Sequence, residues 1–125
     1  RALDVDHLDG SCWLSAGRSG IFRIDAGGEV SLLTTTIEQP DVLALDSAGG
    51  IGWVADRSTQ DVFWFSLDRG NNEEPFVVHA VDARFGNQVD LAPTVEGCWI
   101  VDRTASRVLY YRPLDRSRLE WSDLE

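Results

Sequence analysis

The chain is organised around one strand–turn–strand signature. This stretch reads Ile51-Gly52-Trp53-Val54-Ala55-Asp56-Arg57-Ser58-Thr59-Gln60-Asp61-Val62-Phe63-Trp64-Phe65. Its two flanks carry the aromatic and β-branched residues typical of strands, and residues 57–60 between them are polar, as in a turn. Residues 98–111 repeat the pattern, and residues 12–24 hold a copy with a shorter turn. The repetition predicts a molecule built from consecutive similar units.

The spacing of the copies indicates the kind of unit. Trp13, Trp53 and Trp99 occupy equivalent positions, at steps of 40 and 46 residues along the chain. Such steps are typical of the four-stranded blades of a propeller. An inner strand is expected ahead of each Trp strand, beginning at Leu3, Leu43 and Val89. A fourth strand is expected at the end of each unit, over residues 29–36, 74–81 and 118–122.

The fold class is therefore predicted to be all-β. No window keeps apolar residues at the 3.6-residue period of a helix, so we expect almost no helix. We expect β-propeller blades of four antiparallel strands, three of them in this chain, forming half of a six-bladed ring or a fragment of a longer propeller. The blades are expected over residues 1–38, 39–86 and 87–125.

Aligned copies also predict which repeated residues are structural. Because Trp13, Trp53 and Trp99 recur in register, we expect all three in the core. Asp56 and Asp102 end their strands where a carboxylate can accept hydrogen bonds from the following turn. These residues are expected to maintain the fold rather than to bind a ligand.

One repeated position is expected to lie at the surface. Trp64 and Tyr110 align with Arg23, so the position accepts a charged side chain. Trp64 and Tyr110 are therefore candidates for a binding surface that contacts a protein or a glycan.

Composition narrows the classes of partner. The chain has 125 residues, and its formal charge of 11 − 21 = −10 repels nucleic acid and anionic membranes. No apolar run is long enough for a transmembrane helix. Cys12 and Cys98 are expected as unpaired and largely buried thiols, with a disulfide or a metal site as the less favoured alternatives. The compartment is undetermined, with a secreted or cell-envelope protein slightly favoured over a cytoplasmic one.

Residues 53–62 and 99–108 resemble the NHL repeat and, more distantly, the YWTD repeat of lipoprotein-receptor propellers. The shared form is aromatic–Val–Ala/Thr–Asp–turn–Arg/Asp–Val, and Arg107 stands where NHL repeats usually carry Arg. The resemblance extends over nearly the whole chain and implies a β-propeller. It implies no particular activity, because propellers host many unrelated functions.

A weaker resemblance, to the gluconolactonase and regucalcin-like propellers, implies a Ca²⁺ or Mg²⁺ site over the central channel. Asp41 and Asn87 stand at strand starts that match two of that family's metal ligands. Gln88 and Val42 depart from the family by replacing glycines, and the third ligand, a Glu, has no counterpart. The favoured alternative is that Asp41 and Asn87 are ordinary turn residues and that no cofactor is bound.

Other sites receive less support from the sequence. Asp4, Asp6 and Asp9 form an acidic cluster, but its spacing departs from that of a calcium-binding EF-hand loop. His7 and His79 are the only histidines, and no Gly-x-Ser-x-Gly motif supplies a nucleophile for them. No catalytic residues are therefore assigned.

Three blades leave two apolar faces without a neighbour, because propellers close with typically four to eight blades. The ring is expected to be completed by a second copy packed head to tail or by further blades of a longer chain. The start of the chain at Arg1, directly on a strand, slightly favours the longer chain.

The sequence thus supports two functional hypotheses. The first is a non-catalytic propeller scaffold or binding module for a protein or glycan. The second is a metal-dependent lactonase-like hydrolase or lyase that uses Asp41 and Asn87.

Overall fold

The computed structural model describes residues 2–34, 36–67 and 76–122. The protein is all-β and contains three four-stranded antiparallel sheets, as predicted. The only helical turn in the described part is η1 (Gly17–Ser19), which lies in the β2–β3 connection. Each sheet is a simple meander of consecutive strands, consistent with a fragment of a propeller, and we call the sheets blades 1, 2 and 3 in chain order.

The strand bounds follow the repeat. Blade 1 contains β1 (Leu3–Val5), β2 (Cys12–Ser15), β3 (Ile21–Ile24) and β4 (Val30–Thr34). Blade 2 contains β5 (Pro40–Asp46), β6 (Ile51–Asp56), β7 (Asp61–Ser66) and β8 (His79–Ala80). Blade 3 contains β9 (Val89–Pro93), β10 (Cys98–Asp102), β11 (Arg107–Arg112) and β12 (Ser117–Ser122). All strand pairs within the blades are antiparallel.

The fourth strands differ in length. β4 lies within the predicted range 29–36, and β12 pairs with β11 along its whole length. β8 has two residues, although a strand was predicted over residues 74–81; residues 74 and 75 lie outside the described part.

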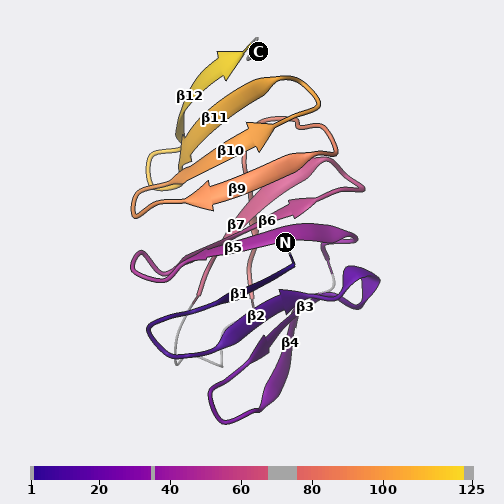
Figure 1. Cartoon of the computed structure of the whole chain (residues 1–125), viewed down its shortest axis with the longest axis vertical. Helices are drawn as coiled ribbons and strands as arrows, with labels where there is room; N and C mark the ends of the chain where they lie inside the picture. The colour runs from indigo at the N-terminus through magenta and orange to yellow at the C-terminus, as the bar shows by residue number, and fades with distance from the viewer. Residues whose placement is uncertain (1, 35, 68–75, 123–125) are drawn as a thin grey trace.

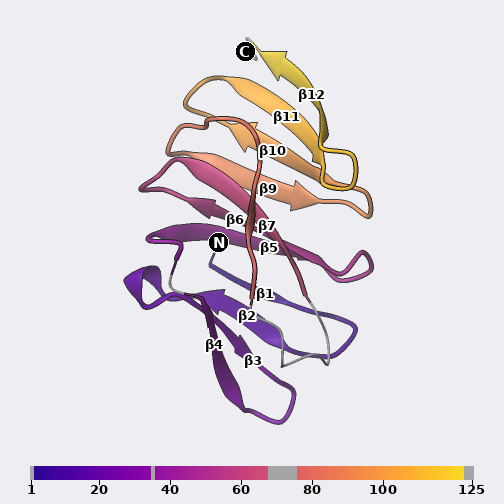
Figure 2. The same cartoon turned by 180° about the vertical axis from the view of Figure 1, so that it is seen from behind.

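The blades follow one another along the long axis of the molecule, with β4 at one end and β12 at the other (Figures 1 and 2). The first strands are neighbours across the blades, because β1 packs beside β5 and β5 packs beside β9. Blade 2 is therefore covered on both faces, whereas blades 1 and 3 are each covered on one.

Two apolar layers hold the blades together. Trp13 of blade 1 is buried against blade 2, where it stacks on Phe65 with ring centroids 5.7 Å apart. Trp53 of blade 2 is buried against blade 3, where its ring meets that of Tyr111 edge-on at 6.3 Å. The same rule operates at both junctions: the Trp of one blade packs on an aromatic ring of the next.

The prediction that Trp99 is a core residue was wrong. Trp99 is 40% exposed, whereas Trp13 and Trp53 are each 1% exposed. The cause is position rather than sequence, because the Trp residues of blades 1 and 2 pack against the following blade, whereas among the described residues no blade packs on this face of blade 3. Trp99 instead contacts Tyr110 and Trp121 of its own sheet, at 4.8 and 5.6 Å.

The two predicted Asp caps are confirmed. Asp56, 3% exposed, accepts hydrogen bonds from the amides of Ser58 at 2.9 Å and Glu38 at 3.1 Å. Asp102, 1% exposed, accepts them from the amides of Ala105 at 3.2 Å and Gly86 at 3.0 Å. Each carboxylate therefore ties the turn after its strand to the segment that enters the blade.

The pairing corrects the alignment of the third inner strand. Leu43 pairs with Val54, the residue after Trp53, and in blade 3 the residue paired with Ile100 is Leu91. Val89 instead pairs with Asp102, as Pro40 does with Asp56. Both turns have four residues, but β10 begins one residue before Trp99 whereas β6 begins two residues before Trp53. The partner of Trp99 is therefore seven residues back, at Ala92, and that of Trp53 is nine residues back, at Ala44, so an equal count back from each Trp starts two residues too early in blade 3.

Both cysteines are unpaired, as predicted. Cys98 is fully buried, and burial raises the pKa of its thiol to about 12, so it is protonated at neutral pH. Cys12 is only half-buried, because it lies on the face of blade 1 that no other blade covers.

Candidate functional site

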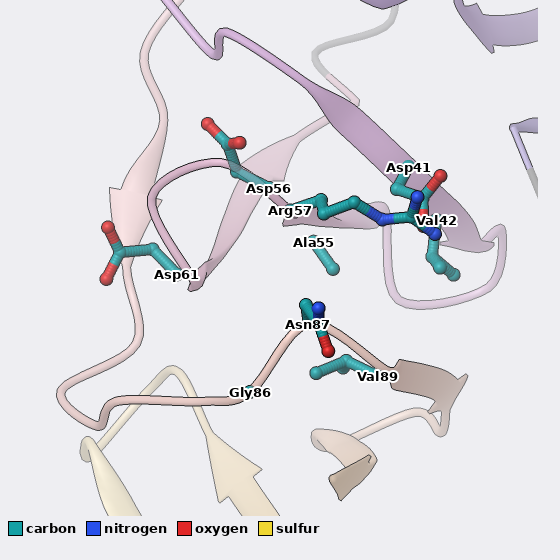
Figure 3. Close-up of a pocket in the computed structure, with 9 residues that line it drawn as sticks. All are labelled: Asp41, Val42, Ala55, Asp56, Arg57, Asp61, Gly86, Asn87 and Val89. Carbon is teal, nitrogen blue, oxygen red and sulfur yellow. The ribbon is translucent and has the colours of Figure 1, made fainter. Parts of the chain in front are cut away.

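Asp41 and Asn87 line the same pocket, where β5 begins and where the chain approaches β9 (Figure 3). The pocket is a shallow depression that opens to solvent and has room for about one water molecule. Its lining comes from blades 2 and 3 and consists of Asp41, Val42, Ala55, Asp56, Arg57, Asp61, Gly86, Asn87 and Val89. The structure thus brings together the two residues that the sequence singled out.

Two irregular backbone features place these side chains. The register of β5 against β6 shifts between Pro40 and Val42, leaving Asp41 unpaired in the ladder. A shift of this kind bends a strand and redirects the side chain of the extra residue. On the other side, Gly86 lies against the β10–β11 turn, where a Cβ atom would be 2.3 Å from Cβ of Thr104. The segment before β9 can pass this close to the β10–β11 turn only because residue 86 is a glycine.

One side-chain oxygen of each candidate residue already has a protein partner. Arg57 forms an ion pair with Asp41, with Nη2 and Oδ2 3.0 Å apart. The hydroxyl of Thr104 donates to Oδ1 of Asn87 at 3.3 Å. A cation that bound here would have to displace the Arg57 guanidinium from the Asp41 carboxylate.

The same ion pair recurs in blade 3. Arg103 contacts Asp90 with Nη2 and Oδ2 2.7 Å apart, and Arg103 follows its capping Asp102 as Arg57 follows Asp56. We did not predict these pairs from the sequence. The signal that could have found them is the repeated Asp-Arg step, together with an Asp at the start of each inner strand.

Asp56, one of the three Asp residues that line the pocket, caps the turn after its strand. Burial favours the neutral form of Asp56, but the hydrogen bonds from Ser58, Thr59 and Glu38 outweigh burial and lower its pKa. Asp56 is therefore an ionised cap. In the described part of the chain, no cluster of three or more His, Cys, Asp or Glu side chains is placed to hold a metal. Asp41 and Asn87 offer two oxygen donors, fewer than the six to eight that Ca²⁺ prefers.

The acidic cluster at the N-terminal end serves local structure. Asp4 accepts a hydrogen bond from the amide of Leu45 at 2.8 Å, which ties blade 1 to blade 2. Asp6 accepts one from the amide of Leu8 at 3.1 Å. Burial raises the pKa of Asp9, but hydrogen bonds from Ser11 and the charge of Arg23 outweigh it and lower the pKa to about 2.

The two binding-surface candidates do occupy equivalent positions. Trp64 pairs with Trp53, and Tyr110 pairs with Trp99, as Arg23 pairs with Trp13. They do not share a surface, however. Trp64 is packed against the apolar layer between blades 2 and 3 and stacks on His79 at 4.3 Å.

Tyr110 lies on the face of blade 3 that no blade covers. It belongs to an aromatic group with Trp99 and Trp121, and its hydroxyl lies 2.8 Å from that of Thr94. Trp121 was not singled out by sequence reasoning, because β12 has no matching Trp in the other fourth strands.

Comparison of the sequence with protein-family models finds no match, and comparison with curated proteins finds none either. In the described part of the chain, no helix is long and apolar enough to cross a membrane.

Proposed function

We propose that this chain forms part of an NHL-like β-propeller that serves as a non-catalytic scaffold or binding module. The ring is completed by further blades, supplied by a second copy or by more chain. The observation that supports this reading most directly is the repeated junction, in which Trp13 packs on Phe65 and Trp53 packs on Tyr111. Propellers are built by repeating the same contact between successive four-stranded blades.

The end of the molecule at which the inner strands begin is the proposed binding surface. It presents the ion pairs Asp41–Arg57 and Asp90–Arg103, whose side chains are between 44% and 68% exposed. Exposed ion pairs contribute little to stability, so their groups are available to a polar partner at small cost. A protein or a glycan can use both the carboxylates and the guanidinium groups.

A metal-dependent hydrolase or lyase is the second candidate, because Asp41 and Asn87 line one pocket. Calorimetric titration of the chain with Ca²⁺ and Mn²⁺ discriminates between the two proposals. The scaffold proposal expects no saturable binding and no shift of the melting temperature. Saturable binding that disappears in both Asp41→Ala and Asn87→Ala would favour the enzyme. Asp90→Ala, which removes the equivalent carboxylate in blade 3, is the matched control.

A further inference from the structure

We propose that two copies of this chain close head to tail into a six-bladed ring, with the outer face of blade 3 packing on the outer face of blade 1 of the partner copy. The inference rests on the propeller part of the proposed function and not on its binding role. Because the closure has twofold symmetry, the same junction forms twice.

The outer face of blade 1 is entirely apolar. Residues directly opposite each other in neighbouring strands share a face of the sheet. The face opposite Trp13 is therefore built from the side chains of Leu3, Val5, Cys12, Leu14, Phe22, Ile24, Val30 and Leu32. Leu3, Val30 and Leu32 are 46%, 60% and 54% exposed. Such a continuous apolar face marks an interaction surface.

The outer face of blade 3 is apolar at its centre, with bulkier side chains. By the same pairing it carries Asp90, Ala92, Trp99, Val101, Val108, Tyr110, Arg112, Ser117, Leu119 and Trp121. Its charged members are Asp90 and Arg112, which lie at opposite edges of the face and are paired with Arg103 and Glu96. Trp99, Leu119 and Trp121 are 40%, 62% and 45% exposed.

The two internal junctions indicate how these faces meet. At each junction, the Trp of one blade packs on an aromatic ring of the next blade. That ring belongs to the residue paired with the position just before the Trp of the second blade. This residue is Phe65 opposite Gly52 in blade 2, and Tyr111 opposite Cys98 in blade 3. In blade 1 the residue opposite Cys12 is Ile24. Trp99 of one copy is therefore expected to pack on Ile24 of the other.

The chemistry of the two faces favours a second copy over an unrelated partner. The chain carries both halves of one junction. Blade 3 presents a Trp that no other blade covers, and blade 1 presents the matching apolar position. Their sizes are complementary, since the three rings on blade 3 would meet mainly aliphatic side chains on blade 1. Three blades from each copy give a number within the range that closes a propeller.

The test measures the mass and the thiol reactivity of the 125-residue chain. Sedimentation between about 1 and 200 µM is expected to show twice the chain mass of 13.9 kDa. Ile24→Asp and Trp99→Asp are each expected to raise the dimer dissociation constant by more than tenfold. Leu114→Asp, which alters a side chain that is 99% exposed in the β11–β12 turn, is the matched control and is expected to remain dimeric.

A second readout distinguishes closure from misfolding. Cys12 lies on the outer face of blade 1, so the dimer should shield it from an aromatic disulfide reagent, whereas Cys98 is buried in every state. Trp99→Asp, at the opposite end of the chain, should therefore speed the reaction of Cys12 at least severalfold and leave Cys98 unreactive. Only direct packing of the two faces links these residues.

A wild-type chain that stays monomeric over this range, with Cys12 reacting equally fast in wild type and Trp99→Asp, would overturn the inference. So would a larger assembly that both variants leave intact. Either outcome leaves the metal titration interpretable, because that experiment reads the pocket between blades 2 and 3 of one copy.

Discussion

The side chains that repeat in this chain are of two kinds. Some accept hydrogen bonds from backbone amides, and others pack against a neighbouring blade. Asp56 and Asp102 belong to the first group, since each is buried and bonds amides from two separate segments. A buried carboxylate of this kind leaves unsatisfied N–H groups behind when it is removed. The two Asp caps are therefore expected to contribute more to the stability of the fold than the exposed ion pairs do.

Asp56→Ala is expected to lower the free energy of unfolding by roughly 2 kcal/mol or more, because the amides of Ser58 and Glu38 lose their acceptor. Chemical denaturation monitored by tryptophan fluorescence measures the change. Asp41→Ala in the same blade removes an exposed ion pair and is expected to cost at most about 0.5 kcal/mol. Equal losses in the two variants would contradict the assignment of Asp56 as a cap.

At the scale of the strand, close packing within one blade prepares the surface that the neighbouring blade uses. Gly52 in β6 is opposite Phe65 in β7, and a Cβ atom at Gly52 would lie 2.3 Å from the Phe65 ring. Phe65 is fully buried and stacks on Trp13. The absence of a side chain at Gly52 therefore positions the ring that joins blades 1 and 2.

Gly52→Ala is expected to destabilise the protein by about 1–3 kcal/mol, because the added methyl group displaces Phe65 in a filled core. Thermal unfolding, combined with near-ultraviolet circular dichroism of the Trp13 environment, provides the measurement. Gly27→Ala is the control, since Gly27 is exposed in a turn and the substitution should be neutral or slightly stabilising. A stable Gly52→Ala variant would show that Phe65 has room to move.

For the whole molecule, self-association depends on the balance between repulsion of like charges and burial of apolar surface. Each copy carries a net charge of −10, so two copies repel each other at low ionic strength. The proposed junction is apolar and gains little from ion pairs between copies. The affinity between two copies should therefore rise with salt concentration, because salt screens the repulsion.

Raising the salt concentration from about 0.02 M to about 0.5 M is expected to strengthen self-association, because salt screens the like charges while apolar burial persists. Sedimentation equilibrium at several salt concentrations measures the trend. Trp99→Asp at the same concentrations is the control and should remain weakly associated throughout. A dimer that dissociates as salt rises would indicate an interface held by ion pairs instead.

The three sheets and the two Asp caps can be predicted from the sequence alone. The reason is that strand pairing and turn capping depend on residues close together in the chain, as in the Trp53–Val62 hairpin with Asp56 as its cap. The strand-start residues Asp41 and Asn87 line one pocket, because neighbouring blades share an orientation; their role as metal ligands stays a prediction.

The burial of a side chain that faces another blade cannot be predicted from the repeat, because it depends on packing between distant segments. Trp99 has the sequence context of Trp13 and Trp53, yet it is exposed because none of the described blades packs on its face of blade 3. The partners of Asp41 and Asn87 and the separation of Trp64 from Tyr110 likewise arise from contacts between distant segments. A local pattern specifies a blade, but burial depends on what packs against it.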